Sequence, residues 1–299
     1  MNKRGNLYGT TFLGGKFGYG SAFRLNAKGG EKVLHSFSNG TDGARPLAGL
    51  VMDKKGNVYG TTIQGGTHNA GTVFQLNATG AAKILHSFDN TGTDGFYPYG
   101  GLVMDTKGNL YGTTTAGGTY NGGTVFELGP NGTETILHNF GNGVDGNAPA
   151  VGLVIDAEGN LYGTTNYGGA NSSCNGGRGC GTAFELSTNG TETILYNFGA
   201  SGTDGYYPYA GLVMDTKGNL YGTTALGGAN SSCNAGSGCG TAFKLTANGT
   251  ETILHSFGAT ETDGYSPFDA LAIDTNGNLY GTTANGGQYG SGIIFKLTP

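Results

Sequence analysis

Short runs of apolar and polar residues recur along this chain at intervals of 51–59 residues. A segment that reads Gly-Asn-Val-Tyr-Gly-Thr-Thr begins at Gly56. The same segment with leucine in place of valine begins at Gly5, Gly108, Gly159, Gly218 and Gly277. Self-similarity at a fixed period is the signature of a repeat architecture. The pattern therefore predicts six copies of one module, at approximately residues 1–48, 49–100, 101–151, 152–210, 211–269 and 270–299.

Each full module contains four short segments typical of β-strands. In the third module they cover residues 101–105, 109–114, 123–128 and 134–140. These segments are rich in β-branched and aromatic residues and are bounded by Gly, Asn and Asp. The first and second segments, and likewise the third and fourth, are separated by three to five residues, which favours antiparallel hairpins.

Apolar residues on both faces of the segments predict sheets that are covered on both sides. Leu102 and Met104 alternate with Val103, so apolar side chains point to both faces of the strand. A sheet with one solvent-exposed face would have a polar residue at the middle position. A four-stranded meander followed by a longer link is the layout of a propeller blade. We predict an all-β, six-bladed β-propeller of four-stranded antiparallel blades that forms a single domain over residues 1–299. A parallel β-helix or solenoid is the alternative, and the hairpins count against it.

The two ends of the chain predict incomplete blades. The first module begins at its second strand and the last stops after its third, which leaves 22 strands where six full blades would have 24. Three explanations stay open: a ring that closes with two three-stranded blades, a piece of a longer repeat array, or bare edge strands that pair with another chain.

The run Gly-Leu-Val-Met-Asp-Thr-Lys-Gly-Asn-Leu-Tyr-Gly-Thr-Thr, followed by Gly-Thr-Val-Phe-Glu-Leu and Ile-Leu-His-Ser-Phe, resembles the GloVer (Gloeo/Verruco) tandem repeat. The resemblance covers essentially the whole chain in six copies. It implies an exported bacterial repeat protein of the kind that often carries surface-anchoring signals. It implies no agreed reaction and supplies no catalytic residues.

Composition and charge narrow the class of protein. The chain has 62 Gly, but its 17 Tyr and 15 Phe provide enough apolar surface to fold. Its net charge is −5 and it has no basic stripe, so we expect no nucleic-acid partner. We also expect no membrane span, since no apolar run reaches the length of one. Residues 1–5 lead directly into a repeat and show no signal peptide, and no anchor follows Pro299.

Four cysteines lie in two equivalent insertions, as the pairs Cys174 with Cys180 and Cys233 with Cys239. This spacing favours two local disulfides in an oxidising compartment. Free thiols and a metal site are the alternatives, and zinc would want CxxC-like spacing with a nearby His. Together with the resemblance, the cysteines predict an extracellular or cell-surface location.

Candidate binding residues lie in the longer connections, which in a meandering blade emerge at one edge of every sheet. Exposed aromatic rings beside carboxylates suit a polysaccharide or surface glycan, because rings stack on sugar C–H faces and polar groups bind the hydroxyls. Filling gaps between blades is the alternative role for these rings. The candidates are Tyr97, Tyr99, Tyr120, Tyr167, Tyr207, Tyr209, Asp94, Asp204 and His68.

No metal or cofactor is predicted, and calcium at the recurring Asp-Gly turns is an alternative to their structural role. Four histidines share one slot of the fourth strand, which indicates packing, whereas His68 stands alone in a loop. The leading hypothesis is a non-catalytic binding propeller. A polysaccharide lyase or hydrolase and a structural repeat protein that self-associates through its edges are the alternatives.

Overall fold

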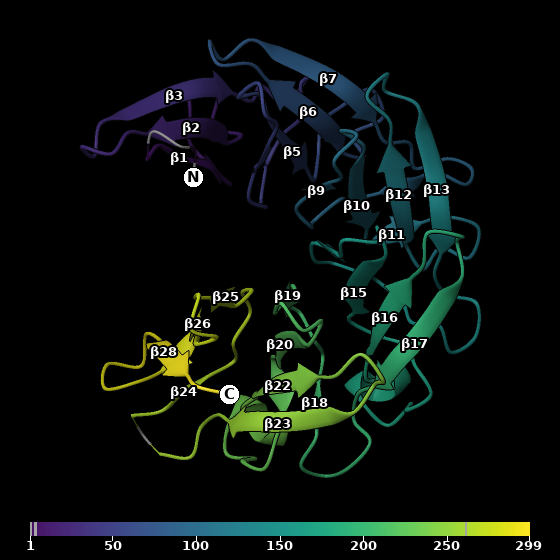
Figure 1. Cartoon of the computed structure of the whole chain (residues 1–299), viewed down its shortest axis with the longest axis vertical. Coiled ribbons are helices and arrows are strands. Elements are labelled where there is room, and N and C mark those ends of the chain that lie inside the picture. Colours follow the sequence, from purple (N-terminus) through teal and green to yellow (C-terminus); the bar gives the residue numbers. More distant parts are fainter. Residues whose placement is uncertain (1, 3–4, 261) are drawn as a thin grey trace. The chain divides into compact units, whose positions relative to one another are not determined.

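The structure, a computed structural model, describes residues 2, 5–260 and 262–299. Its contacts divide the chain into two compact units, Met1–Phe140 and Gly141–Pro299. Each unit consists of three antiparallel sheets, which are the blades of a six-bladed β-propeller (Figure 1). The prediction of an all-β propeller is confirmed.

The first unit contains three blades with the strand orders β1-β2-β3, β4-β5-β6-β7 and β9-β10-β12-β13, and a separate two-stranded ladder β8-β11. Its strands are β1 (Leu7–Thr11), β2 (Ser21–Leu25), β3 (Glu31–Ser36), β4 (Val51–Met52), β5 (Val58–Thr62), β6 (Thr72–Leu76), β7 (Ala82–Ser87), β8 (Gly95–Phe96), β9 (Val103–Met104), β10 (Leu110–Thr114), β11 (Ala116–Gly117), β12 (Thr124–Leu128) and β13 (Glu134–Asn139).

The second unit repeats this plan with the blades β14-β15-β16-β17, β19-β20-β22-β23 and β25-β26-β28, and the ladders β18-β21 and β24-β27. Its elements are β14 (Val154–Ile155), β15 (Leu161–Thr165), η1 (Asn175–Gly177), β16 (Thr182–Leu186), β17 (Glu192–Asn197), β18 (Gly205–Tyr206), β19 (Val213–Met214), β20 (Leu220–Thr224), β21 (Leu226–Gly227), η2 (Asn234–Gly236), β22 (Thr241–Leu245), β23 (Glu251–Ser256), β24 (Gly264–Tyr265), β25 (Ala272–Ile273), β26 (Leu279–Thr282), β27 (Asn285–Gly286) and β28 (Ile294–Leu297).

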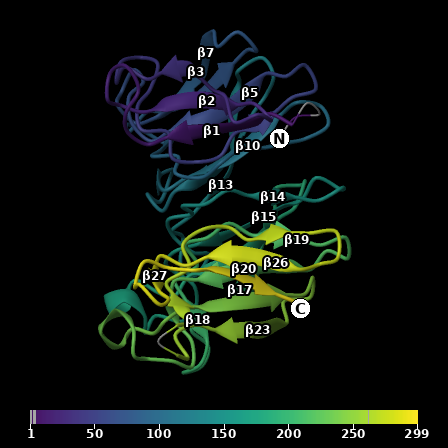
Figure 2. The same ribbon diagram turned by 90° about the vertical axis from the view of Figure 1, so that its left-hand side faces the viewer.

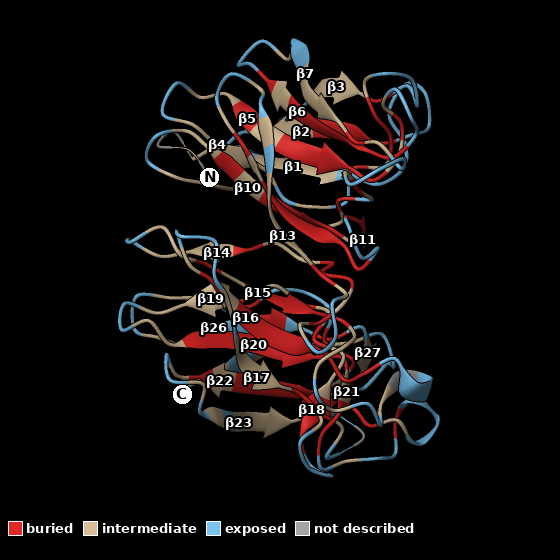
Figure 3. Cartoon of the chain, turned by 90° about the vertical axis from the view of Figure 1, so that its right-hand side faces the viewer, coloured by how far each residue is buried: buried red, intermediate tan, exposed pale blue. Residues whose placement is uncertain are grey.

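The central strands of each blade carry the core. In the four-stranded blades the second and third strands are largely buried and the fourth is intermediate, as Figure 3 shows for β15, β16 and β17, whereas β1 and β28 of the terminal blades are partly exposed. Gly112 in β10 lies opposite Phe126 in β12, and a Cβ on Gly112 would come within 2.7 Å of that ring. The glycine of the repeated Leu-Tyr-Gly-Thr-Thr run is therefore required by close packing.

Neighbouring blades within a unit are joined by pairs of buried phenylalanines. The Phe that follows the fourth strand of one blade meets, edge to face, the Phe in the third strand of the next blade. Edge-to-face contact is the favoured arrangement of aromatic pairs. The centroid distances are 4.9–5.2 Å for Phe37 with Phe74, Phe88 with Phe126, Phe198 with Phe243 and Phe257 with Phe295.

Both terminal blades are three-stranded, as the sequence predicts. The first lacks its first strand and the last lacks its fourth; Figure 2 shows parts of both, β1 to β3 and β26. In each case the adjoining strand, β1 or β28, is the last strand of its sheet. The helical turns η1 and η2 are short, and no helix among the described residues has the length and apolar character that crossing a membrane requires.

Two connections of each blade meet at one edge of the sheets. We call the connection between the fourth strand of one blade and the first strand of the next a link, and the connection between the second and third strands a loop. The link strand β8 pairs with the loop strand β11 of the next blade, and β18 pairs with β21 in the same way. Links and loops therefore share one edge, the loop edge. We call the opposite edge, with the tight hairpin turns, the turn edge.

Candidate functional site

Each link has a residue in a left-handed backbone conformation at one equivalent position. The residue directly precedes a proline, and its φ lies between 55° and 61° in all five links: Arg45, Tyr97, Ala148, Tyr207 and Ser266. Bulky side chains rarely adopt such angles, and residues held this way cluster at functional sites. At Tyr207 the backbone N–H donates to the Cys180 carbonyl and the carbonyl accepts from Ala225. One backbone geometry thus presents four kinds of side chain at the five links, with tyrosine at two of them.

Aromatic rings form a continuous row at the loop edge of the second unit. The rings of Tyr167 and Tyr207 lie 5.3 Å apart, and Tyr207 stacks on Tyr209 at 5.5 Å. Tyr209 meets Phe268 edge to face at 5.8 Å. The guanidinium of Arg178, inside the first cysteine insertion, lies 5.5 Å from the Tyr167 ring. We call Tyr167, Tyr207, Tyr209 and Phe268 the aromatic row.

A hydrogen bond joins two tyrosines of the aromatic row. The Tyr167 hydroxyl donates to the Tyr207 hydroxyl at 3.4 Å. Burial, followed by this hydrogen bond, raises the pKa of Tyr207 well above its ordinary value. The three tyrosines are half-buried and Phe268 is exposed. The rings are therefore held in place by packing while part of their surface stays accessible to solvent.

In the first unit the predicted residues are less closely grouped. Tyr97 is exposed and its ring lies 5.0 Å from that of Phe96, whereas Tyr99 is half-buried. Tyr120 is half exposed. His68 is exposed, and its Nδ1 atom lies 3.8 Å from a carboxylate oxygen of Asp89. The sequence thus identifies these positions, and only the structure shows which tyrosines form a row.

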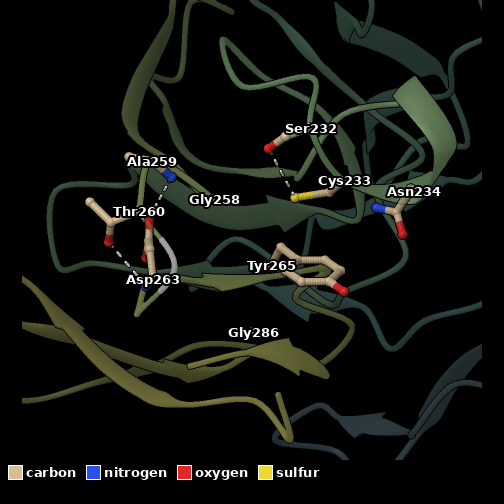
Figure 4. A pocket seen from close by; sticks show the side chains of 9 residues that line it. All are labelled: Ser232, Cys233, Asn234, Gly258, Ala259, Thr260, Asp263, Tyr265 and Gly286. Atoms are coloured by element: carbon tan, nitrogen blue, oxygen red, sulfur yellow. Dashed lines mark hydrogen bonds between the residues drawn. The ribbon is translucent and has the colours of Figure 1, made fainter. Parts of the chain in front are cut away.

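Both predicted disulfides are present, Cys174–Cys180 and Cys233–Cys239. Beside the second lies a cavity of about 460 Å³, shown in Figure 4. Tyr265, Asn234 and Thr260 are among the residues that line it. Asp263 also lines it and accepts the backbone N–H of Ala259. The cavity presents a ring, an amide and a hydroxyl group, which are groups that bind sugar hydroxyls.

The candidate aspartates lie in clusters that support the links. The carboxylate of Asp94 accepts the backbone N–H groups of Asp89 and Gly95 and lies 3.3 Å from Nε2 of His86. A carboxylate oxygen of Glu134, from the next blade, lies 3.5 Å from the same nitrogen. Contact of Asp94 with a ligand stays a prediction, and its role in the link is a structural fact.

Burial dominates the acid–base properties of this cluster. It raises the pKa of Glu134 to about 7, with the His86 charge opposing the shift and Asp94 adding to it. Burial alone would lower the pKa of His86. The hydrogen bond to Asp94 and the charge of Glu134 together outweigh it and raise the pKa. The ligand atoms of His86, Asp94 and Glu134 lie within 4.8 Å of one another, so these three residues could hold a divalent cation.

The second unit contains the same cluster with tyrosine in place of histidine. The Tyr196 hydroxyl donates to Asp204 at 2.9 Å, and Asp204 is 4% exposed. Burial and Asp204 raise the pKa of Glu251 to about 7. These glutamates were not among the predicted site residues. Each is the first residue of the fourth strand of its blade and is half-buried there.

Comparison with solved structures supports the fold. The chain matches a luciferin-regenerating enzyme at 13% identity and a TM-score of 0.55, over 99% of this chain and 88% of the other. A protein from Bacteroides uniformis with a provisional 6-phosphogluconolactonase assignment matches at 17% identity and a TM-score of 0.55, over 99% and 83%. The extracellular domain of a provisionally assigned hybrid two-component system protein from B. thetaiotaomicron matches at 12% identity and a TM-score of 0.58. The match covers 97% of this chain and 33% of the other.

No curated protein matches the chain in sequence. The family model described as the Gloeobacter/Verrucomicrobia repeat matches residues 1–176 and 172–299. These two segments span the whole chain, in agreement with the resemblance found in the sequence. The chain belongs to the Gloeobacter/Verrucomicrobia repeat family.

Proposed function

We propose that this protein is an exported binding propeller that holds a carbohydrate against the aromatic row of its second unit. The observation that carries the proposal is the row itself: four rings from one loop and two links, at successive distances of 5.3, 5.5 and 5.8 Å. Rings arranged in this way offer several adjacent stacking faces. A sugar polymer presents a C–H face on each residue, so successive sugars can stack on successive rings.

Other features support the same function. Arg178, at one end of the aromatic row, offers N–H donors to sugar hydroxyls or carboxylates. Tyr97 and Tyr99 of the first unit occupy the link positions that correspond to Tyr207 and Tyr209, so a second, smaller contact is available to a polymer. The two disulfides are typical of a protein that works outside the cytoplasm.

A glycan array tests the proposal with the full chain and the double variant Tyr207→Ala/Tyr209→Ala. We expect the variant to lose about tenfold or more in affinity for the glycan that binds best, because two stacking faces are removed. Tyr289→Ala is the matched control, since Tyr289 is 85% exposed and lies outside the aromatic row. Undiminished binding by the double variant would exclude the row as the contact.

A hydrolase is the second candidate, and one observation favours it. Glu134 has a pKa of about 7 and lies 3.5 Å from His86, which are properties of a general acid beside a second titrating group. The recurrence of the arrangement at Tyr196, Asp204 and Glu251 favours a structural role instead. Turnover of a bound oligosaccharide or a sugar lactone that is lost in Glu134→Gln and kept in Glu251→Gln would establish hydrolysis.

A further inference from the structure

A cavity of about 300 Å³ lies at the turn edge of the first unit, and its lining contains no residue of the aromatic row and no predicted site residue. Both the second and the third blade contribute to its wall. Leu85, Met104 and Leu110 supply apolar surface. Four exposed lysines also line the cavity, namely Lys54, Lys55, Lys83 and Lys107.

The carboxylates beside these lysines are already occupied. Oδ1 of Asp53 accepts the backbone N–H groups of Lys55 and Asn57, and Oδ2 accepts the Asn57 amide and the Tyr59 hydroxyl. Although burial opposes it, the hydrogen bonds from Asn57 hold the pKa of Asp53 below its ordinary value. Asp105 accepts the corresponding donors of its own turn.

The lysine ammonium groups are therefore available to a ligand. Within the described part of the chain, none of the four forms an ion pair with a carboxylate. The lining carries these four lysines and two carboxylates, Asp53 and Asp105, so its formal charge is +2 and its potential is positive. An anionic group that enters the cavity would meet this potential and the lysine N–H donors together.

A second cavity, of about 570 Å³, adjoins the first and shares Asp53, Lys54 and Lys55 with it. It extends the basic surface to Arg24 of the first blade. Nε of Arg24 is buried and donates to no acceptor among the described residues. The half-buried Arg24 side chain therefore adds N–H donors to the wall of the second cavity. The two cavities together suit a ligand longer than a single small anion.

The fourth blade, in the second unit, replaces these basic residues at equivalent positions. In the second blade Tyr59, Gln75 and Lys83 form a row across three strands. In the fourth blade the row reads Tyr162, Glu185 and Thr193. The turn residues Lys54 and Lys55 correspond to Ala157 and Glu158. The repeat framework therefore tolerates either charge, and the lysines are not required by the fold.

We propose that the two cavities at the turn edge of the first unit bind an acidic polysaccharide, with Lys54, Lys55, Lys83 and Lys107 pairing with its carboxylate or sulfate groups and Arg24 donating from the adjoining cavity. This site is separate from the aromatic row, and neither proposal depends on the other.

The chemistry of the walls favours a polysaccharide over a nucleic acid. Single-stranded nucleic acids bind to basic grooves in which aromatic rings stack on successive bases. Here the lining tyrosines, Tyr8 and Tyr59, are half-buried, and the Tyr59 hydroxyl is held by Asp53 and Gln75. Amide groups such as those of Gln75 and Asn6 match sugar hydroxyls.

Binding of polygalacturonate to the full chain, measured by calorimetry at low and at physiological salt, tests the proposal. Dextran sulfate separates sulfate from carboxylate recognition, and neutral dextran controls for sugar alone. The variant Lys54→Ala/Lys55→Glu/Lys83→Thr introduces the residues that the fourth blade carries at those positions, so we expect it to fold. It should lose about tenfold or more in affinity for the acidic polymer, and wild-type affinity should fall with salt.

The control variant Lys217→Glu/Lys244→Glu makes the same change in net charge in the second unit, and we expect it to change the affinity less than about twofold. The proposal is overturned if neither acidic polymer binds at low salt, if the triple variant binds as the wild type does, or if both variants lose affinity equally. Tighter binding of single-stranded RNA than of either acidic polysaccharide would also overturn it. Binding of neutral glycan to the aromatic row is a separate readout in every variant.

Discussion

The two units of the chain share one packing scheme and differ in charge and in surface chemistry. Residues 1–140 carry 11 of the 15 basic and 8 of the 20 acidic residues, a formal charge of +3. Residues 141–299 carry the other 4 basic and 12 acidic residues, a formal charge of −8. The first unit has the lysine-lined cavities, and the second has both disulfides and the aromatic row.

Comparing the two units shows which positions of the repeat are required for the fold. The phenylalanines that join blades and the glycine beneath them recur in both units, because each is fully packed. The residue before the link proline varies among the copies, from the exposed Tyr97 to the buried Ser266, and the first hairpin turn varies because its side chains are exposed. Repetition therefore marks the framework, and variation among the copies marks the places where a ligand can be bound.

The largest expected effect tests the shared framework. Phe88→Ala in the first unit and Phe198→Ala in the second each remove a fully buried ring that packs on the Phe of the next blade. Each should lower the free energy of unfolding by about 3–5 kcal/mol. Urea denaturation measures the loss, and hydrogen exchange shows which unit loses protection. A loss in one unit several-fold smaller than in the other would contradict a shared framework.

The next effect tests a difference between the units. Cys233→Ala/Cys239→Ala removes a disulfide that closes a short loop, and should lower the free energy of unfolding by about 2 kcal/mol. Hydrogen exchange should rise in the second unit only, since the first has no cysteine. Mass spectrometry of the wild type without reductant should show the loss of two hydrogens per pair. Four free thiols in the wild type would contradict the oxidised state.

Much of the fold could be predicted because its strands and turns are local patterns. The hairpins around Lys107, the three-stranded ends and the disulfides all follow from short-range spacing. The ladder of Phe96 with Ala116 could not be predicted, since two-residue strands show no periodicity. The cluster of His86 with Glu134 joins residues of different blades, 48 positions apart in the chain. For the same reason the sequence identified the tyrosines of the aromatic row without showing that they meet.

A comparison of the two carboxyl clusters by their dependence on pH gives the smallest expected effect. Glu134 and Glu251 both have a folded-state pKa of about 7, above the ordinary value of 4.5. The folded protein therefore binds these protons more tightly than the unfolded chain does. Their contribution to stability is complete below about pH 4.5 and is lost as pH rises through about 7. Glutamine imitates the protonated form, so either Glu→Gln variant should be close to neutral at pH 5.

At pH 8 each variant should be more stable than the wild type by about 1 kcal/mol, a figure reduced for the partial exposure of both carboxyl groups. Glu134→Gln should keep a residual fall in stability with pH, because the raised pKa of His86 makes its contribution disappear over the same range. Glu251→Gln should also keep a fall, because it leaves His86, Glu134 and Glu192 in place, and burial raises the pKa of Glu192 to about 8. Thermal unfolding from pH 5 to 8 measures both slopes, with the exposed Glu31→Gln as the charge control. Equal destabilisation of a variant at pH 5 and pH 8 would mean that its carboxyl group is ionised in the folded protein.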